Sequence, residues 1–100
     1  MTRAKVNDMI RHTETYDTLH AGRLVAAGGV EILANLPNTR MWQIIVQNSP
    51  GSQASVFVGN NLTQPWELVA GANITIPIDR TNKVYVNATA GDIINWLAMG

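Results

Sequence analysis

The stretch Lys83–Gly100 reads KVYVNATAGDIINWLAMG, and its pattern decides the fold class. Two apolar-rich runs flank the turn residues AGD, which is typical of two β-strands joined as a hairpin. In the first run Val84 and Val86 alternate with polar residues, so we predict that they face inward. In the second run both alternating sets are largely apolar, and we assign Ile94 and Trp96 to the core side.

The same period of two recurs upstream through short runs separated by turn residues. The residues predicted to face inward are Ile44, Val46, Val56, Val58, Ile74, Ile76 and Ile78. About seven or eight such strands at a spacing of ~8–12 residues predict an all-β protein, a single antiparallel β-sandwich of the jelly-roll-like kind. Ile45 interrupts the polar side of its strand, which indicates that this second face is also partly covered.

The first 22 residues have a different character. Half of the charged residues lie within positions 1–23, together with both histidines, His12 and His20. Apolar residues are too sparse there to build an independent core element. We therefore predict an N-terminal arm over residues 1–22 and a β-sandwich domain over residues 23–100. The arm is either a solvated tail or a strap that orders on a neighbouring protein, and the low charge of the sandwich favours the strap.

Charge and composition limit the partners. Charged residues make up 14% of the chain and the formal net charge is zero. Because phosphate binding needs a basic surplus or stripe, we expect no nucleic-acid partner. Low charge also means weak self-repulsion, which favours association with other copies. No apolar run approaches the ~20 residues of a membrane span and no signal peptide is evident, so we expect no membrane partner and synthesis in a cytoplasm.

No pattern indicates catalysis, a metal site or a cofactor. The chain has no cysteine, and we expect His12 and His20 to be solvated arm residues, where a rigid site is difficult to build. The acidic residues of the sandwich are widely spaced, and the last two read as ordinary turn residues: Glu31, Glu67, Asp79 and Asp92. A glycosidase-like carboxylate pair stays open, although nothing in the spacing points to one. We predict no enzyme, no cofactor and no metal.

The aromatic residues are candidates for packing or contact. The alternation places Trp42 in the core. Trp66 follows Pro65 in a turn-like stretch, and is either an exposed contact with a protein or a sugar ring or a residue packed at a sheet edge. Trp96 would cap the core or lie at a seam between subunits. Tyr85 faces outward and is a candidate rim contact.

Three stretches of the chain share a pattern of short strands and polar turns. In LPNTRMWQIIVQNSPGSQASVFVGNN a strand ending in Gln-Asn is followed by a polar turn and a Val-x-Val-Gly strand. The stretches LVAGANITIPID and KVYVNATAGDIINWLAM resemble the second half of the same pattern. Together these stretches, which cover about residues 24–100, resemble small structural proteins of tailed bacteriophages. The likeness includes no catalytic fingerprint.

This resemblance implies a virion component: a capsid decoration or cement protein, a head-fibre or vertex protein, or a baseplate module. Such proteins are commonly β-sandwiches, often trimeric, that bind the shell through an N-terminal arm, so we expect a homo-oligomer, with a trimer as the guess. Since the chain stops at residue 100, a decoration or vertex role is expected over adhesion. The expected location is the virion, with the major capsid protein or another virion protein as partner. The candidate partner-binding residues are Arg3, Lys5, Arg11, Tyr16, Trp66 and Tyr85.

Two other classes of function remain. A tail, carbohydrate-binding or receptor-binding module would use Trp66 and the Asn-rich loops. A small enzyme with a diffuse carboxylate site is the remaining alternative, although no base, nucleophile or metal cluster can be named for it.

Overall fold

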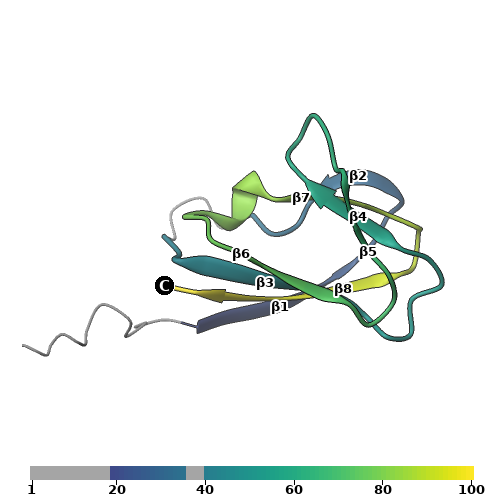
Figure 1. The fold of residues 1–100 in the computed structure, drawn as a ribbon, viewed down its shortest axis with the longest axis horizontal. Helices are drawn as coiled ribbons and strands as arrows, with labels where there is room; N and C mark the ends of the chain where they lie inside the picture. Colours follow the sequence, from purple (N-terminus) through teal and green to yellow (C-terminus); the bar gives the residue numbers. More distant parts are fainter. Residues whose placement is uncertain (1–18, 36–39) are drawn as a thin grey trace, which may run out of the picture.

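Eight β-strands alternate between two four-stranded antiparallel sheets in the computed structural model, which describes residues 19–35 and 40–100 (Figure 1). The elements are β1 (Leu19–Val25), β2 (Gly29–Ile32), β3 (Gln43–Asn48), β4 (Val56–Gly59), β5 (Trp66–Leu68), β6 (Asn73–Ile76), a short 3₁₀ turn η1 (Thr81–Lys83), β7 (Tyr85–Ala88) and β8 (Ile93–Met99). One sheet has the order β1-β8-β3-β6 and the other β2-β7-β4-β5. The all-β prediction is confirmed.

The strand order identifies the sandwich as a jelly roll. Apart from the β4–β5 hairpin, each consecutive pair of strands lies in different sheets, so the chain crosses between layers at nearly every connection. Figure 1 shows the two layers, with the β1-β8-β3-β6 sheet beneath the other. Two interleaved four-stranded sheets of this kind form the architecture of jelly-roll domains.

The last two strands are present where the sequence predicts them, but they do not form a hairpin. β7 belongs to one sheet and β8 to the other. The turn between them contains Gly91 at φ +89°, a left-handed conformation that favours glycine, and the amide of Asp92 donates to the carbonyl oxygen of Thr89 at 3.0 Å. This turn carries the chain across the sandwich, and β8 pairs instead with β1 and β3.

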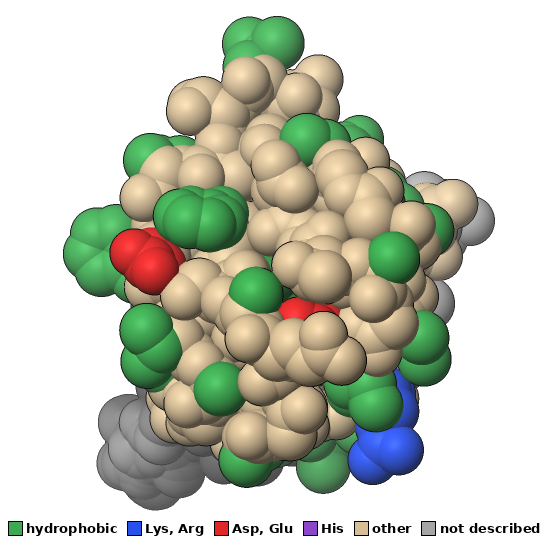
Figure 2. Space-filling model, turned by 90° about the vertical axis from the view of Figure 1, so that its right-hand side faces the viewer, with side chains coloured by type: hydrophobic (Ala, Val, Ile, Leu, Met, Phe, Trp, Pro, Cys, Tyr) green, Lys and Arg blue, Asp and Glu red, His purple; other side chains and the backbone are tan. Residues whose placement is uncertain are grey.

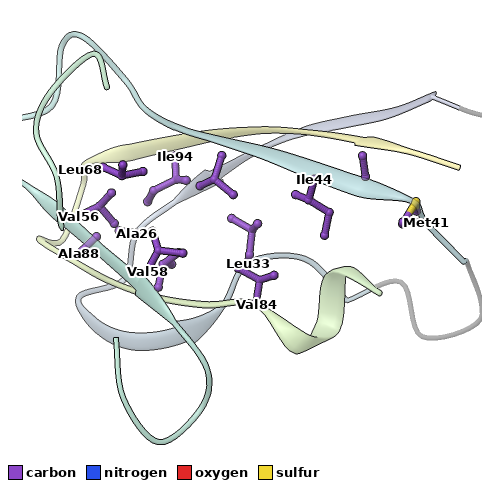
Figure 3. Packing of buried hydrophobic residues seen from close by; sticks show 13 residues of the cluster. Ala26, Leu33, Met41, Ile44, Val56, Val58, Leu68, Val84, Ala88 and Ile94 are labelled. Carbon is purple, nitrogen blue, oxygen red and sulfur yellow. The ribbon is translucent and has the colours of Figure 1, made fainter. Parts of the chain in front are cut away.

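The core lies between the inner faces of the two sheets, and Figure 3 shows its side chains pointing toward one another from both layers. The buried hydrophobic residues are Ala26, Leu33, Met41, Ile44, Val46, Val56, Val58, Leu68, Val84, Val86, Ala88, Ile94 and Ala98. The inward assignment is confirmed for every predicted residue in β3, β4 and β7, and for Ile94 in β8. The isoleucines of β6 and Trp96 are partly buried against this cluster.

Two buried polar side chains hold the loops at one end of the sandwich. Asn48 is fully buried, and its amide nitrogen donates to the carbonyl oxygens of Ala54 (3.0 Å) and Leu68 (2.9 Å). The carboxylate of Asp92 accepts from the backbone amides of Gln53 (2.9 Å) and Ala54 (3.1 Å). Asp92 is therefore a turn residue that also fixes the β3–β4 loop to the start of β8. Figure 2 shows this end of the molecule, where few charged side chains are visible.

The core prediction for Trp42 is wrong, since this side chain is 62% exposed. A bend at Trp42 precedes β3, so the alternation does not extend back beyond Gln43. Met41 takes the buried position in its place. The alternation begins at Gln43, one residue later than the sequence predicts.

The solvated-arm prediction for His20 is also wrong. Leu19–Val25 forms β1, so residues 19–22 of the predicted arm belong to the first strand of the sandwich. His20 is half-buried there, and its Nε2 atom is buried without a hydrogen-bond partner among the described residues. His12 lies outside the described residues.

The register of β3 can be tested with two neighbouring isoleucines. Ile44 is fully buried, whereas Ile45 faces outward and is half-buried. We expect Ile44→Ala to lower the free energy of unfolding by about 2–5 kcal/mol through lost burial and a residual cavity. Ile45→Ala should cost about 1 kcal/mol or less in dilute protein. Urea denaturation measures both, and equal costs would contradict the observed register.

Candidate interaction surface

The outward-facing side of the β1-β8-β3-β6 sheet, here named the outer sheet face, has unusual chemistry for a solvent-facing sheet. Its side chains form four rows across the strands: Leu19–Met99–Gln43, Ala21–Leu97–Ile45–Thr75, Arg23–Asn95–Gln47–Asn73 and Val25–Ile93. An antiparallel sheet with one face in water normally alternates apolar inward and polar outward residues. Here most outward positions of β8 are apolar, so the face departs from that rule.

The second row forms the apolar centre of this face. Leu97 of β8 is 39% exposed and lies between Ala21 of β1 and Ile45 of β3. None of these side chains is covered by a described element on the outer side. Apolar surface left open in this way is typical of interaction sites.

The third row is a line of hydrogen-bonded polar side chains. Nε of Arg23 donates to Oδ1 of Asn95 at 3.3 Å, and Nδ2 of Asn95 donates to Oε1 of Gln47 at 3.1 Å. Asn73 of β6 stands next to Gln47 in the register and continues the row. These bonds hold the amides in a fixed order across the sheet.

The apolar and polar rows meet in a shallow, open hollow of about 560 Å³. Its lining residues are Ala21, Gly22, Ile45, Gln47, Asn73, Asn95, Trp96 and Leu97. Gly22 lies against the indole of Trp96 on the inner side: a methyl group at Gly22 would lie 2.5 Å from Cζ2 of that ring. Glycine is therefore required at this point of β1 if Trp96 is to keep its place.

The outer sheet face has few charged groups, which favours binding of a partner. Arg23 is the only charged residue among the outward positions of these four strands; the rest are alkyl chains, amides, a thioether and one hydroxyl. Depletion of charge around an apolar centre with polar groups beside it is the composition of a protein–protein interface core. The same mixture can also receive a sugar, through its amides and its alkyl surface.

The predicted site residues do not meet on this face. Arg3, Lys5, Arg11 and Tyr16 lie outside the described residues. Trp66 is 58% exposed and lies at the edge of the other sheet, in β5. Tyr85 is half-buried in β7.

Trp66 and Tyr85 also point to different sides of their own sheet. Trp66 is opposite Val58, a buried inward residue, whereas Tyr85 is opposite Gly59, the next residue of β4. Since successive residues of a strand face opposite sides, the structure does not bring the two aromatic residues together.

The described acidic side chains serve local structure. Oδ1 of Asp79 accepts from Nζ of Lys83 at 2.7 Å, and this hydrogen bond lowers the pKa of the exposed Asp79 carboxyl. Glu31 accepts from the amide of Ala27 at 2.9 Å, and Glu67 accepts from the hydroxyl of Ser55 at 2.7 Å.

The described part of the chain has neither a metal-binding cluster nor a membrane-spanning helix. Over residues 19–35 and 40–100, no three histidine, cysteine or acidic side chains lie close enough to hold a metal ion. Within the same ranges there is no helix with the length and apolar character needed to cross a membrane.

Comparison with known proteins gives no relative: no protein-family model, curated protein or solved structure matches this chain.

The sequence carried two signals of the outer sheet face. Ile45 interrupts the polar side of its strand, and the last strand is apolar on both sides. Ile45 and the outward apolar residues of the last strand, Ile93 and Leu97, lie in the apolar rows of this face. The polar row could not be found from sequence, because its members come from four strands whose order is set by long-range pairing.

The outer sheet face should be the main apolar binding surface of the described sandwich. A dye that fluoresces in apolar surroundings should bind the folded protein, and Leu97→Asp should reduce its signal several-fold, because a carboxylate would enter the hollow. The matched control is Leu62→Asp: Leu62 is 86% exposed but lies in the β4–β5 loop, so its loss should change little. A signal that depends on Leu62 and not on Leu97 would place the apolar site elsewhere.

Proposed function

We propose that the chain is a non-enzymatic structural protein of a tailed-bacteriophage virion, which decorates or stabilises the capsid through its arm and its charge-poor sandwich surface. The observation that carries the proposal is the outer sheet face, where a single charge accompanies an apolar row. A surface of this kind loses little by desolvation and gains by being covered.

The fold and the resemblance support the class of protein. Jelly-roll sandwiches occur in viral capsid proteins and in lectin domains, so the architecture suits a virion component as well as a sugar-binding module. The resemblance of residues 24–100 to small phage structural proteins is the ground for choosing the virion. Fold alone does not imply function, so the surface chemistry has to support the choice.

In this proposal the two parts of the chain do different work. The outer sheet face covers an apolar part of the major capsid protein or another virion protein. Arg3, Lys5 and Arg11 of the arm pair with carboxylates on that partner, and Tyr16 adds an aromatic contact. Each exposed ion pair contributes only about 0–1 kcal/mol, so affinity depends on many copies binding side by side.

Removal of the arm tests the tether. Deletion of residues 1–18 leaves β1 complete, so the truncated protein should keep its β-rich circular dichroism spectrum and its cooperative unfolding. It should no longer co-sediment with empty capsids of the bacteriophage that encodes the chain, whereas the intact chain should.

Two results of that experiment would count against the proposal. If the truncated protein binds shells as well as the intact chain, the arm is not the tether. If the intact chain itself fails to co-sediment, the virion role is wrong.

The exposure of Trp66 favours a second candidate, a carbohydrate-binding or receptor-binding module. Trp66 lies directly after the β4–β5 loop, which is closed by Asn60: Oδ1 of Asn60 accepts from the amides of Leu62 and Thr63, both at 2.9 Å. An exposed indole beside an ordered Asn-rich loop is a surface on which a sugar ring can stack.

A glycan array separates the two candidates. Under the second, the protein gives a sugar signal that Trp66→Ala removes, because the stacking surface is lost. Trp42→Ala is the matched control, since Trp42 is similarly exposed but lies directly before β3 of the other sheet, next to Gly100. The absence of any sugar signal from the intact chain would exclude the second candidate for the glycans tested.

A further inference from the structure

β1 differs from the other edge strands of the sandwich. The two sheets end in four edge strands: β1, β6, β2 and β5. β6 has four residues and is followed at once by Pro77; β5 has three and is preceded by Pro65; β2 has four and begins at Gly29, whose φ is +83°. Short strands, prolines and irregular backbone are the means by which proteins block pairing at sheet edges. β1 has seven residues and none of these features.

Among the described residues, 19–35 and 40–100, no strand pairs with the outer edge of β1, which leaves a regular set of backbone groups there. The amide of Ala26, directly after β1, donates to the carbonyl oxygen of Asp92, directly before β8, at 2.8 Å. Bonding alternates along an antiparallel pair, so Leu24, Gly22 and His20 are the β1 residues that bond to β8. The remaining residues direct their N–H and C=O groups to the open edge: Leu19, Ala21, Arg23 and Val25.

We propose that β1 pairs antiparallel with β1 of a second copy, about a two-fold axis at Gly22. In this register Ala21 lies opposite the partner's Arg23 and Leu19 opposite the partner's Val25. Each N–H and C=O group on the open edge of β1 then faces a C=O or N–H group on the edge of the partner's β1. This pairing gives about eight inter-chain hydrogen bonds and joins the two β1-β8-β3-β6 sheets into one.

The side chains of β1 fit this register and disfavour the two registers shifted by one residue. Leu19 and Val25 are 65% and 61% exposed in the single chain, and the pairing places these two apolar residues beside each other. Arg23 faces the small Ala21 of the partner. A shift of the axis to Arg23 would set the two guanidinium groups directly opposite, which is destabilising. A shift to Ala21 would set Arg23 against Leu19.

Gly22 is suited to the centre of the interface between the two β1 strands, here named the seam. Gly22 and its copy would form a pair without mutual hydrogen bonds, where two strands approach most closely, about 4.5 Å between Cα atoms. The absence of a side chain there also leaves room for the indole of Trp96 on the inner side of the sheet. The pairing would place the two Trp96 rings on either side of the axis, which matches the sequence-based alternative that Trp96 lies at a subunit seam.

This inference goes beyond the proposed function, because it rests on the edge of β1 and not on the virion, and its two-fold dimer differs from the trimer that the resemblance implies. A protein that binds shells as a monomer would overturn the seam alone. A dimer that ignores shells would overturn the virion role alone.

Opposite charges introduced at one position test the seam in the full chain. Sedimentation equilibrium of the unmodified protein should show a dimer, with twice the 10.9 kDa of the single chain, that dissociates on dilution. Ala21→Glu places a carboxylate opposite the partner's Arg23 and should strengthen the dimer about threefold to thirtyfold. Ala21→Lys places a like charge there and should weaken it by a similar factor.

The matched control is Thr75, which ends the same row of side chains on the opposite edge strand, β6. Thr75→Lys and Thr75→Glu should leave the dimer unchanged, and circular dichroism should show that all four variants are folded. If both charges at Ala21 weaken association and those at Thr75 do so too, the copies stack face to face, and the edge pairing is wrong. A monomer at every concentration would also overturn it.

Discussion

The position of β8 is the constraint on which the rest of the structure depends. This strand pairs with β1 on one side and β3 on the other, so it sets the register of both. Its inner side chains Ile94 and Ala98 are fully buried. Because a strand alternates its side chains, burying these two residues forces Ile93, Leu97 and Met99 to the outside. The core and the apolar outer sheet face are therefore two consequences of one strand that is apolar on both sides.

The low charge of the chain gives this outer face its importance. Only 14% of the residues are charged, and half of those lie within the first 23 positions, so the sandwich has little electrostatic repulsion against other surfaces. We propose that the outer sheet face covers a virion partner, that the edge of β1 joins two copies, and that the arm adds weak ionic contacts. Each interaction is small, and the repetition of subunits makes the sum large.

Local sequence patterns predicted much of the fold and little of the surface. Alternation identified the inward residues of β3, β4 and β7, because burial on one face imposes a period of two. It failed at Trp42, where a bend ends the alternation. The concentration of charge in residues 1–23 placed His20 in the arm, although β1 already begins at Leu19. Ile45 already indicated a covered second face. Strand order depends on pairing between distant segments, such as β1 with β8, so neither the polar row of the outer sheet face nor the open edge of β1 could be derived from sequence.

Residue-resolved hydrogen exchange on β1 measures whether its outer edge pairs with a second copy. The amides of Gly22 and Leu24 bond within the sheet and should exchange slowly at any protein concentration. The amides of Ala21 and Arg23 point to the open edge, so the account predicts that they become equally protected in concentrated protein and lose that protection on dilution. If Ala21 and Arg23 exchange freely at every concentration while Gly22 and Leu24 stay protected, the edge remains unpaired and the account is contradicted.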